Sequence, residues 1–274
     1  MVFITSQETL SKVFGNEVVA VEGEKSLFDK ITLQLELAES LLVDEVVGDF
    51  SASIGPGTSL FNACVTFVAC HALRQAIPSL DLILTPNGFG VVQNTNVAPA
   101  SKERVERLSE SMQIRRDTAL NTIIKMLMRE EGWQDSEQRQ WFAEGIFQLP
   151  EQSTMWCKRK DYSDDWEALK AMRLESLPIL QRYRDRYISN EVMDRVQLAL
   201  CSNKADDIND RRLGKRLISI VLREMNGTPF HHKYIDPIVN YLREVDDDWK
   251  ASSVAALYAE PVFQNTKKSP GYFF

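Results

Sequence analysis

Apolar residues recur at helical spacing near the start of the chain. In residues 24–47 a stripe with a period near 3.6 residues predicts one helix, and three further leucines widen it into a broad face that we expect to be buried. Residues 59–76 are apolar on almost every side, which is typical of a helix surrounded by others. The stripe consists of Leu27, Ile31, Leu35, Ala38, Leu42 and Val46, and the widening leucines are Leu33, Leu37 and Leu41.

A third, longer helix is predicted over residues 101–131. Ser101 is a good N-cap, Gly132 ends the pattern, and at 1.5 Å per residue the rod would be about 45 Å long. Arg115 and Arg116 fall where the apolar stripe would next recur. Either the helix leaves its own core there and reaches toward an acidic partner, or both arginines are solvated.

Residues 165–263 are helical by the same criterion. The pattern predicts a helix bent or restarted near Pro178, a shorter one opened by Ser189, and a third that ends at Asn226 and Gly227. Asp236 and Pro237 resemble the N-cap and first-turn proline of a further helix. Each half thus offers a similar set of helices, which suggests two related helical units.

One short stretch departs from this helical pattern. In LILTPNGFGVVQN, residues 82–94, two apolar runs flank a Pro-Asn-Gly turn, which predicts a β-hairpin. An isolated two-stranded hairpin is marginal in water, so it needs a surface to cover it. That surface is either its own helices or a second protein chain. The residues concerned are Leu82, Ile83, Leu84, Phe89, Val91 and Val92.

Two segments lack helical periodicity. Residues 133–164 mix tryptophans with the basic run 158–160, and we interpret them as a solvated linker rather than a nucleic-acid contact. Residues 264–274 end in Tyr272, Phe273 and Phe274, whose apolar area favours docking on the chain itself or on a neighbouring subunit. We therefore predict a mainly α fold: a helical bundle with a long helix and one short β-hairpin. Its parts are a helical domain of residues 1–132, a linker of 133–164, a second helical domain of 165–263 and an aromatic tail of 264–274.

Composition narrows the class of protein. The chain of 274 residues is 44% hydrophobic and carries a net charge of −7, so it can bury a core but has no general excess of cations for binding nucleic acid. We expect no signal peptide, and no apolar run that approaches the roughly 20 residues of a membrane span. These features predict a protein made in a cytoplasm, without membrane association.

Candidate chemistry is sparse. The four cysteines lack metal-finger spacing and are interpreted as reduced and structural, and His71 as a hydrogen-bonded core histidine. His231 and His232 adjoin Asp236, but adjacent histidines seldom ligate one ion together, and Asp246, Asp247 and Asp248 lack the spacing of a calcium loop. We predict no enzyme activity, no metal site and no cofactor, while a catalytic pair built from residues distant in sequence stays open.

Residues 79–108, SLDLILTPNGFGVVQNTNVAPASKERVERL, carry a resemblance to a known family. The LDL, TP and GFG around the turn, VAPASKERVE, and the terminal GYFF resemble a family of uncharacterised proteins encoded in Bacteroides-group prophages. That family is usually found among virion structural genes and is similar to the head-tail connector or adaptor class of tailed phages, small helical bundles that form a ring beneath the portal. The second helical half departs from the smallest connectors.

The resemblance implies a structural ring protein at the head-tail junction of a virion, made in the cytoplasm of a bacterial host. Its partners would be copies of itself, the phage portal protein and a tail or neck protein, with DNA only as cargo passing through the channel. The hairpin, the terminal aromatics and the two arginines Arg115 and Arg116 are the predicted protein-interaction residues. The alternatives are a tail terminator or tail completion protein, and a cellular helical interaction module or enzyme.

Overall fold

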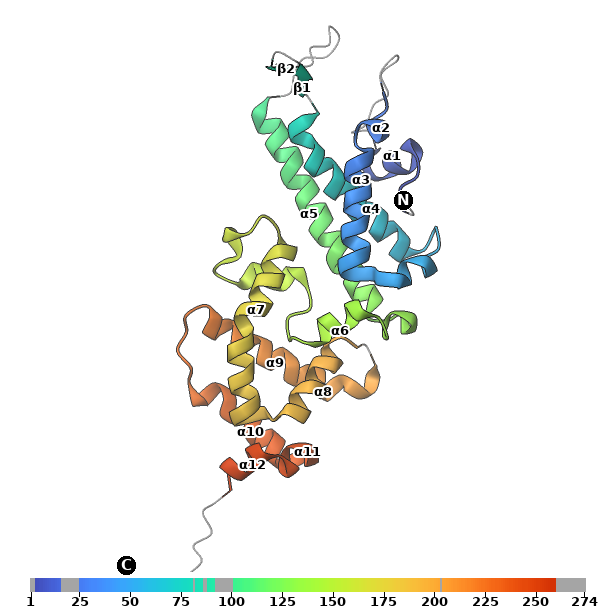
Figure 1. The fold of residues 1–274 in the computed structure, drawn as a ribbon. Coiled ribbons are helices and arrows are strands. Elements are labelled where there is room, and N and C mark those ends of the chain that lie inside the picture. Colours follow the sequence, from blue (N-terminus) through green and yellow to red (C-terminus); the bar gives the residue numbers. More distant parts are fainter. Residues whose placement is uncertain are drawn as a thin grey trace, which may run out of the picture.

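The chain folds into helices stacked in two groups along one long axis. The structure, a computed structural model, describes residues 3–15, 25–80, 82–85, 88–91, 101–202 and 204–259. The N-terminal helices form one end and the C-terminal helices the other, and α6 (Glu137–Ala143) lies where the two groups meet (Figure 1). The predicted helical bundle is confirmed.

The N-terminal group is built around α4 (Ser59–Ala76), which packs between α3 (Thr32–Leu42) and α5 (Lys102–Leu127). Helix α1 (Gln7–Phe14) packs on α4, and α2 (Leu27–Lys30) precedes α3. The buried residues of α4 lie on nearly all its sides, as its continuous apolar sequence predicted; they are Leu60, Cys64, Val65, Phe67, Val68, Ala69, Cys70, Ala72, Leu73 and Ala76.

The prediction for residues 24–47 was wrong in two respects. The segment is divided among α2, α3 and one turn of π-helix, η2 (Val43–Val47), because Ile31 leaves helical geometry at φ −117°. The face is also narrower than expected: Ile31 and Leu35 are buried, but Leu33 and Leu37 are each 62% exposed. Helix α3 packs on α4 along one side, so leucines on its far side find no partner among the described residues.

Length and composition alone qualify residues Ser59–Ser79 as a possible membrane span, contrary to the expectation from sequence. Within the described part of the chain this is the helix that meets that test, and 61% of its apolar window is buried inside the protein. A core helix meets the same test, and α4 occupies the core position here.

Two strands, β1 (Leu82–Thr85) and β2 (Gly88–Val91), pair antiparallel with Leu82 opposite Val91 and Leu84 opposite Phe89. They lie at the end of α4 and α5 that points away from the C-terminal helices (Figure 1). The side chains of these strands and the whole of Val92 lie outside the described residues.

The segment predicted as a solvated linker is folded and largely packed. It contains η5 (Glu131–Trp133), α6 (Glu137–Ala143), η6 (Pro150–Met155) and η7 (Arg159–Asp161). Trp133 is fully buried and donates from Nε1 to the carbonyl of Val46 at 3.0 Å. Further core residues of this segment are Phe142, Ile146, Phe147 and Trp156. Short helical turns have no 3.6-residue stripe, which is why the pattern concealed them.

The C-terminal group contains α7 (Asp165–Tyr183), a π-helical turn η8 (Arg184–Ile188), α8 (Asn190–Leu200), η9 (Ala205–Asp207) and α9 (Ile208–Met225). Helices α10 (His232–Val245), α11 (Asp247–Ala251) and α12 (Ser253–Leu257) follow. Ser189 caps α8 by accepting from the N–H of Val192, and α9 ends before Asn226 and Gly227, both as predicted.

A restart of the helix at Pro178 and a helix start at Asp236 and Pro237 are not found. Helix α7 runs unbroken through Pro178, and α10 begins at His232, so Pro237 lies inside that helix rather than in its first turn. In both cases the packed apolar face on either side of the proline holds the helix together. Tertiary packing therefore outweighs the loss of one backbone hydrogen bond.

Candidate functional site

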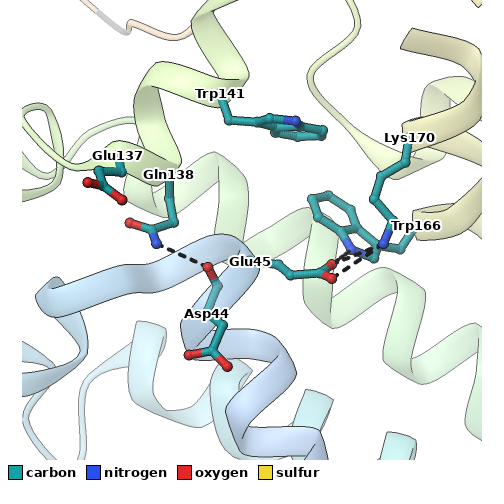
Figure 2. A pocket seen from close by; sticks show the side chains of 7 residues that line it. All are labelled: Asp44, Glu45, Glu137, Gln138, Trp141, Trp166 and Lys170. Atoms are coloured by element: carbon teal, nitrogen blue, oxygen red, sulfur yellow. Dashed lines mark hydrogen bonds and ion pairs between the residues drawn. The ribbon is translucent and has the colours of Figure 1, made fainter. Parts of the chain in front are cut away.

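A groove runs between α6 and α7, at the level where the N-terminal helices meet the C-terminal ones. Its first hollow, about 310 Å³, is lined by residues of η2, α6 and α7: Asp44, Glu45, Glu137, Gln138, Trp141, Trp166 and Lys170 (Figure 2). Trp141 and Lys170 also line a second hollow of about 240 Å³, which continues past Arg173 to Leu174 and Leu177. We call these two hollows together the α6–α7 groove.

Local backbone geometry sets the acidic end of the groove. Gly48 closes the π-helical turn η2 with φ 63° and ψ −151°, a conformation that is essentially restricted to glycine. A Cβ at Gly48 would lie 2.1 Å from Oε1 of Gln138, so glycine also allows α6 to approach. Gln138 uses this position to donate from Nε2 to the carbonyl of Asp44 at 3.0 Å, which joins α6 to η2 (Figure 2).

The centre of the groove is an ion-paired and aromatic cluster. Glu45 accepts a hydrogen bond from Trp166 Nε1 and lies 3.3 Å from Lys170 Nζ, as Figure 2 shows. Lys170 also pairs with Glu167 at 2.8 Å. Burial alone would lower the pKa of Lys170, but the hydrogen bond to Glu167 and the charge of Glu45 raise it overall. The lysine is therefore held protonated and is not available as a base at neutral pH.

Trp141 forms the ridge between the two hollows. Its ring centre lies 5.5 Å from that of Trp166, and Arg173 Cζ lies 3.9 Å from the Trp141 ring centre on the α7 side. Arg173 donates to the carbonyls of Trp141 and Phe142 and, at 2.7 Å, to that of Phe147. Burial lowers the pKa of Arg173 to about 10, which leaves it charged near neutrality. The arginine thus fixes α6 against α7.

The far end of the groove is apolar and exposed. Leu174 is 69% exposed and Leu177 49% exposed, although both stand on a helix whose opposite face is core. Pro178 lacks the N–H that would bond to the carbonyl of Leu174, four residues earlier. The groove therefore presents two leucines beside its acidic, aromatic end.

The lining residues of the groove combine several carboxylates with two tryptophans, one lysine and one arginine. Lys170 is paired with Glu45 and Glu167, whereas Asp44 and Glu137 form no ion pair with another described residue, and no nucleophile stands next to a base among the lining residues. In the part of the chain that the structure describes, no three histidine, cysteine, aspartate or glutamate side chains are placed to hold a metal ion.

Arg116, predicted as an interaction residue or a solvated one, is neither. Its side chain is 2% exposed and lies between Asp117, which accepts from Nε at 3.0 Å, and Asp164, 3.0 Å from Nη1. Asp164 in turn caps α7 by accepting from the N–H of Glu167. A charged residue can therefore interrupt the apolar stripe at this position, because its charge is paired inside the protein and does not require a partner molecule. Its neighbour Arg115 donates to the carbonyl of Val13 and lies over the ring of Phe14.

The buried ion pair perturbs its surroundings. Burial raises the pKa of Asp117. Burial alone would also raise the pKa of Asp164, but the charge of Arg116 and the hydrogen bond from the Glu167 N–H lower it overall. His71, half-buried and stacked on Phe67 with ring centres 5.7 Å apart, has its pKa lowered to about 4 by burial and by Arg116. His71 is thus a neutral packing residue beside a charged cluster.

The other candidate metal ligands predicted from sequence cap helices, form ion pairs or are free thiols. His231 caps α10 by accepting from the N–H of Lys233, and His232 lies 3.5 Å from Asp236. Asp246 and Asp248 both pair with Arg195, as Asp210 of α9 does at 2.8 Å. Cys64, Cys70 and Cys201 are buried and Cys157 is exposed, all as free thiols.

The predicted interaction residues are described only in part. The hairpin lies at one end of the molecule, the tail residues Tyr272, Phe273 and Phe274 lie outside the described residues, and Arg116 is internal. The groove residues were missed from sequence. A usable signal was present in α7, where Leu174 and Leu177 lie outside the core stripe of Leu169, Met172 and Leu180.

Residues 12–143 match a protein family described as "Family of unknown function (DUF6712)", a span just under half of the chain. The matched span includes the β1–β2 pair and the α6 side of the groove, and it ends before α7. Comparisons with the curated proteins and with the solved structures find no match to this chain.

Proposed function

We propose that this protein is a structural subunit that assembles head to tail with copies of itself, as the head-tail connector or adaptor ring of a tailed phage or prophage. The observation that carries the proposal is the α6–α7 groove, which is complementary to the tail of the chain. The groove places acidic and aromatic side chains at one end and exposed leucines at the other. The tail places two lysines before three aromatic residues.

The lengths also agree. From Lys170 to Leu177 along α7 is about 10 Å at 1.5 Å per residue. From Lys268 to Tyr272 the chain spans at most about 14 Å when extended. The lysines can therefore lie beside Asp44, Glu45 and Glu137 while the aromatic rings cover Leu174 and Leu177.

A tail that enters the groove of the next copy makes a heterologous contact, which generates a closed ring when the rotation between neighbours closes. The hairpin, at the far end of α4 and α5, would add a second contact with the neighbour or with the portal protein. In this assembly the groove and tail determine self-association. The identity of the adjoining virion proteins would be determined elsewhere on the subunit.

Self-assembly is tested with two variants that each lack half of the contact. One deletes residues 270–274; the other is Leu174→Asp with Leu177→Asp in the groove. We expect each alone to be monomeric by light scattering coupled to size-exclusion chromatography, and their equimolar mixture to form a dimer, because one intact groove meets one intact tail. Wild-type protein should form a larger closed species.

Leu33→Asp with Leu37→Asp on α3 is the matched control, because it changes two comparably exposed leucines that do not line the groove. It should assemble like wild type. A tail deletion that assembles normally, or a control as defective as the groove variant, would exclude this contact.

The place in the virion is tested separately. Wild-type protein should change mass when mixed with purified portal protein, and labelled protein should be seen at the neck of particles by electron microscopy. A label at the distal end of an isolated tail would instead indicate a tail terminator.

A further inference from the structure

Basic side chains gather along one side of α9. Arg212, Lys215, Arg216 and Arg223 are all exposed, and among the described residues none of them forms an ion pair. The acidic residues of the same helix are engaged elsewhere: Asp210 pairs with Arg195 of α8, and Glu224 pairs with Arg182 of α7. The cations of α9 are therefore left facing solvent in a chain of net charge −7.

Two tyrosines of α10 lie beside these cations. Tyr234 and Tyr241 are seven residues apart and so share one face of the helix. Tyr241 is 39% exposed and lines a hollow of about 180 Å³ with Arg212, Arg216 and Asn209 of α9. The ring of Tyr234 lies 5.2 Å from Arg223 Cζ and 4.9 Å from Lys233 Nζ.

These residues form one continuous strip because α9 and α10 contact each other and are joined by a short turn at residues 226–231. We call it the α9–α10 strip: Arg212, Lys215, Arg216, Arg223, Lys233, Tyr234 and Tyr241. From Arg212 to Arg223 is about 16 Å along the helix.

We propose that the α9–α10 strip binds single-stranded nucleic acid, with phosphates along Arg212, Lys215, Arg216 and Arg223 and a base stacked on Tyr241. A single strand is favoured over a duplex because an exposed tyrosine ring offers stacking that paired bases cannot use. The hollow beside Tyr241 has the arginines at its edge, so base and backbone can be bound together. This site is separate from the α6–α7 groove and does not depend on the proposed assembly.

The experiment is fluorescence anisotropy of a labelled oligothymidylate against the full chain. We expect binding at about 50 mM salt that weakens as salt rises. Arg212→Ala with Arg216→Ala should weaken binding at least tenfold and make the salt slope of log K shallower by about 1.4, which is 0.7 for each lost single-strand phosphate contact. Arg104→Ala with Arg129→Ala is the matched control and should change affinity less than twofold. It removes two exposed arginines, on or near α5, that form no ion pair with the residues that the structure describes.

Stacking is tested with Tyr241→Ala and an abasic oligonucleotide of the same length. Tyr241→Ala should weaken binding of the oligothymidylate about tenfold and leave binding of the abasic strand unchanged. The proposal would be overturned if the strip variant and the control variant lost equal affinity, or if the wild-type chain did not bind the oligothymidylate. Tighter binding to a duplex or to anionic lipid vesicles would also overturn it. Circular dichroism of each variant excludes unfolding as the cause.

Discussion

At the scale of single residues, the main finding is that charge inside this protein is paired across elements that are distant in sequence. Arg116 of α5 lies between its neighbour Asp117 and the α7 cap Asp164. Removing one partner of a buried ion pair leaves uncompensated charge, which typically costs more than the pair itself contributes.

Arg116→Ala should therefore lower the free energy of unfolding by about 3–5 kcal/mol. Arg104→Ala, an exposed arginine on the same helix with no ion pair among the described residues, should change it by less than about 0.5 kcal/mol. Urea unfolding followed by tryptophan fluorescence measures both. Equal effects of the two substitutions would mean that the internal ion pair does not stabilise the fold.

His71 predicts a pH dependence beside the same cluster. Its pKa is lowered from 6.5 to about 4, so the unfolded chain binds more protons between these values. Stability should be fully present above pH 6.5 and should fall by roughly 3 kcal/mol as pH drops through this window. His71→Gln should remove that part of the slope, whereas an unchanged slope would assign the acid sensitivity to other groups.

At the scale of elements, the clearest constraint is the π-helical turn that ends α3. Gly48→Ala introduces a Cβ both in a glycine-only conformation and against Gln138, so we expect a loss of about 1–3 kcal/mol. Gly55→Ala is the control, because nothing lies within 4 Å of its added Cβ and its φ is ordinary. The double variant Gly48→Ala with Gln138→Ala should regain the stability lost through the clash with Gln138, but not the stability lost through the strained backbone conformation. Thermal unfolding measures both variants.

Sequence pattern predicted the long helices because their apolar stripes face a core, as the buried residues Met112, Ile123, Leu169 and Val196 show. The pattern gave wrong predictions where the burial of a residue depends on how separate elements pack together. Leu33 and Leu37 continue an apolar stripe yet face outward, and Trp133 and Phe142 are core residues in a segment without periodicity. The α6–α7 groove could not be predicted, because Glu45, Trp141 and Trp166 come from three elements whose meeting is decided by packing. The exposed leucines of α7 were visible only as departures from a stripe.

At the scale of the whole molecule, the question is whether the two helical groups are independent domains. Trp166 of α7 packs on Trp141 and Phe142 of α6 and bonds to Glu45 of η2. Arg173 of α7 satisfies three carbonyls of residues 141–147. These contacts cover apolar surface of the N-terminal group with a helix that belongs to the C-terminal half.

A fragment of residues 1–143, which ends with the matched family span, should therefore fold poorly, because Trp141 and Phe142 lose the cover of Trp166. A fragment of residues 1–188 retains α7 and should unfold in one cooperative transition, since it keeps both the Trp166 packing and the Asp164–Arg116 ion pair. Urea unfolding of the two fragments, with binding of a hydrophobic dye as a second measurement, distinguishes these outcomes. Cooperative unfolding of the shorter fragment, with a native-like near-ultraviolet spectrum, would show instead that the N-terminal group is a self-sufficient domain and that α7 is an attachment to it.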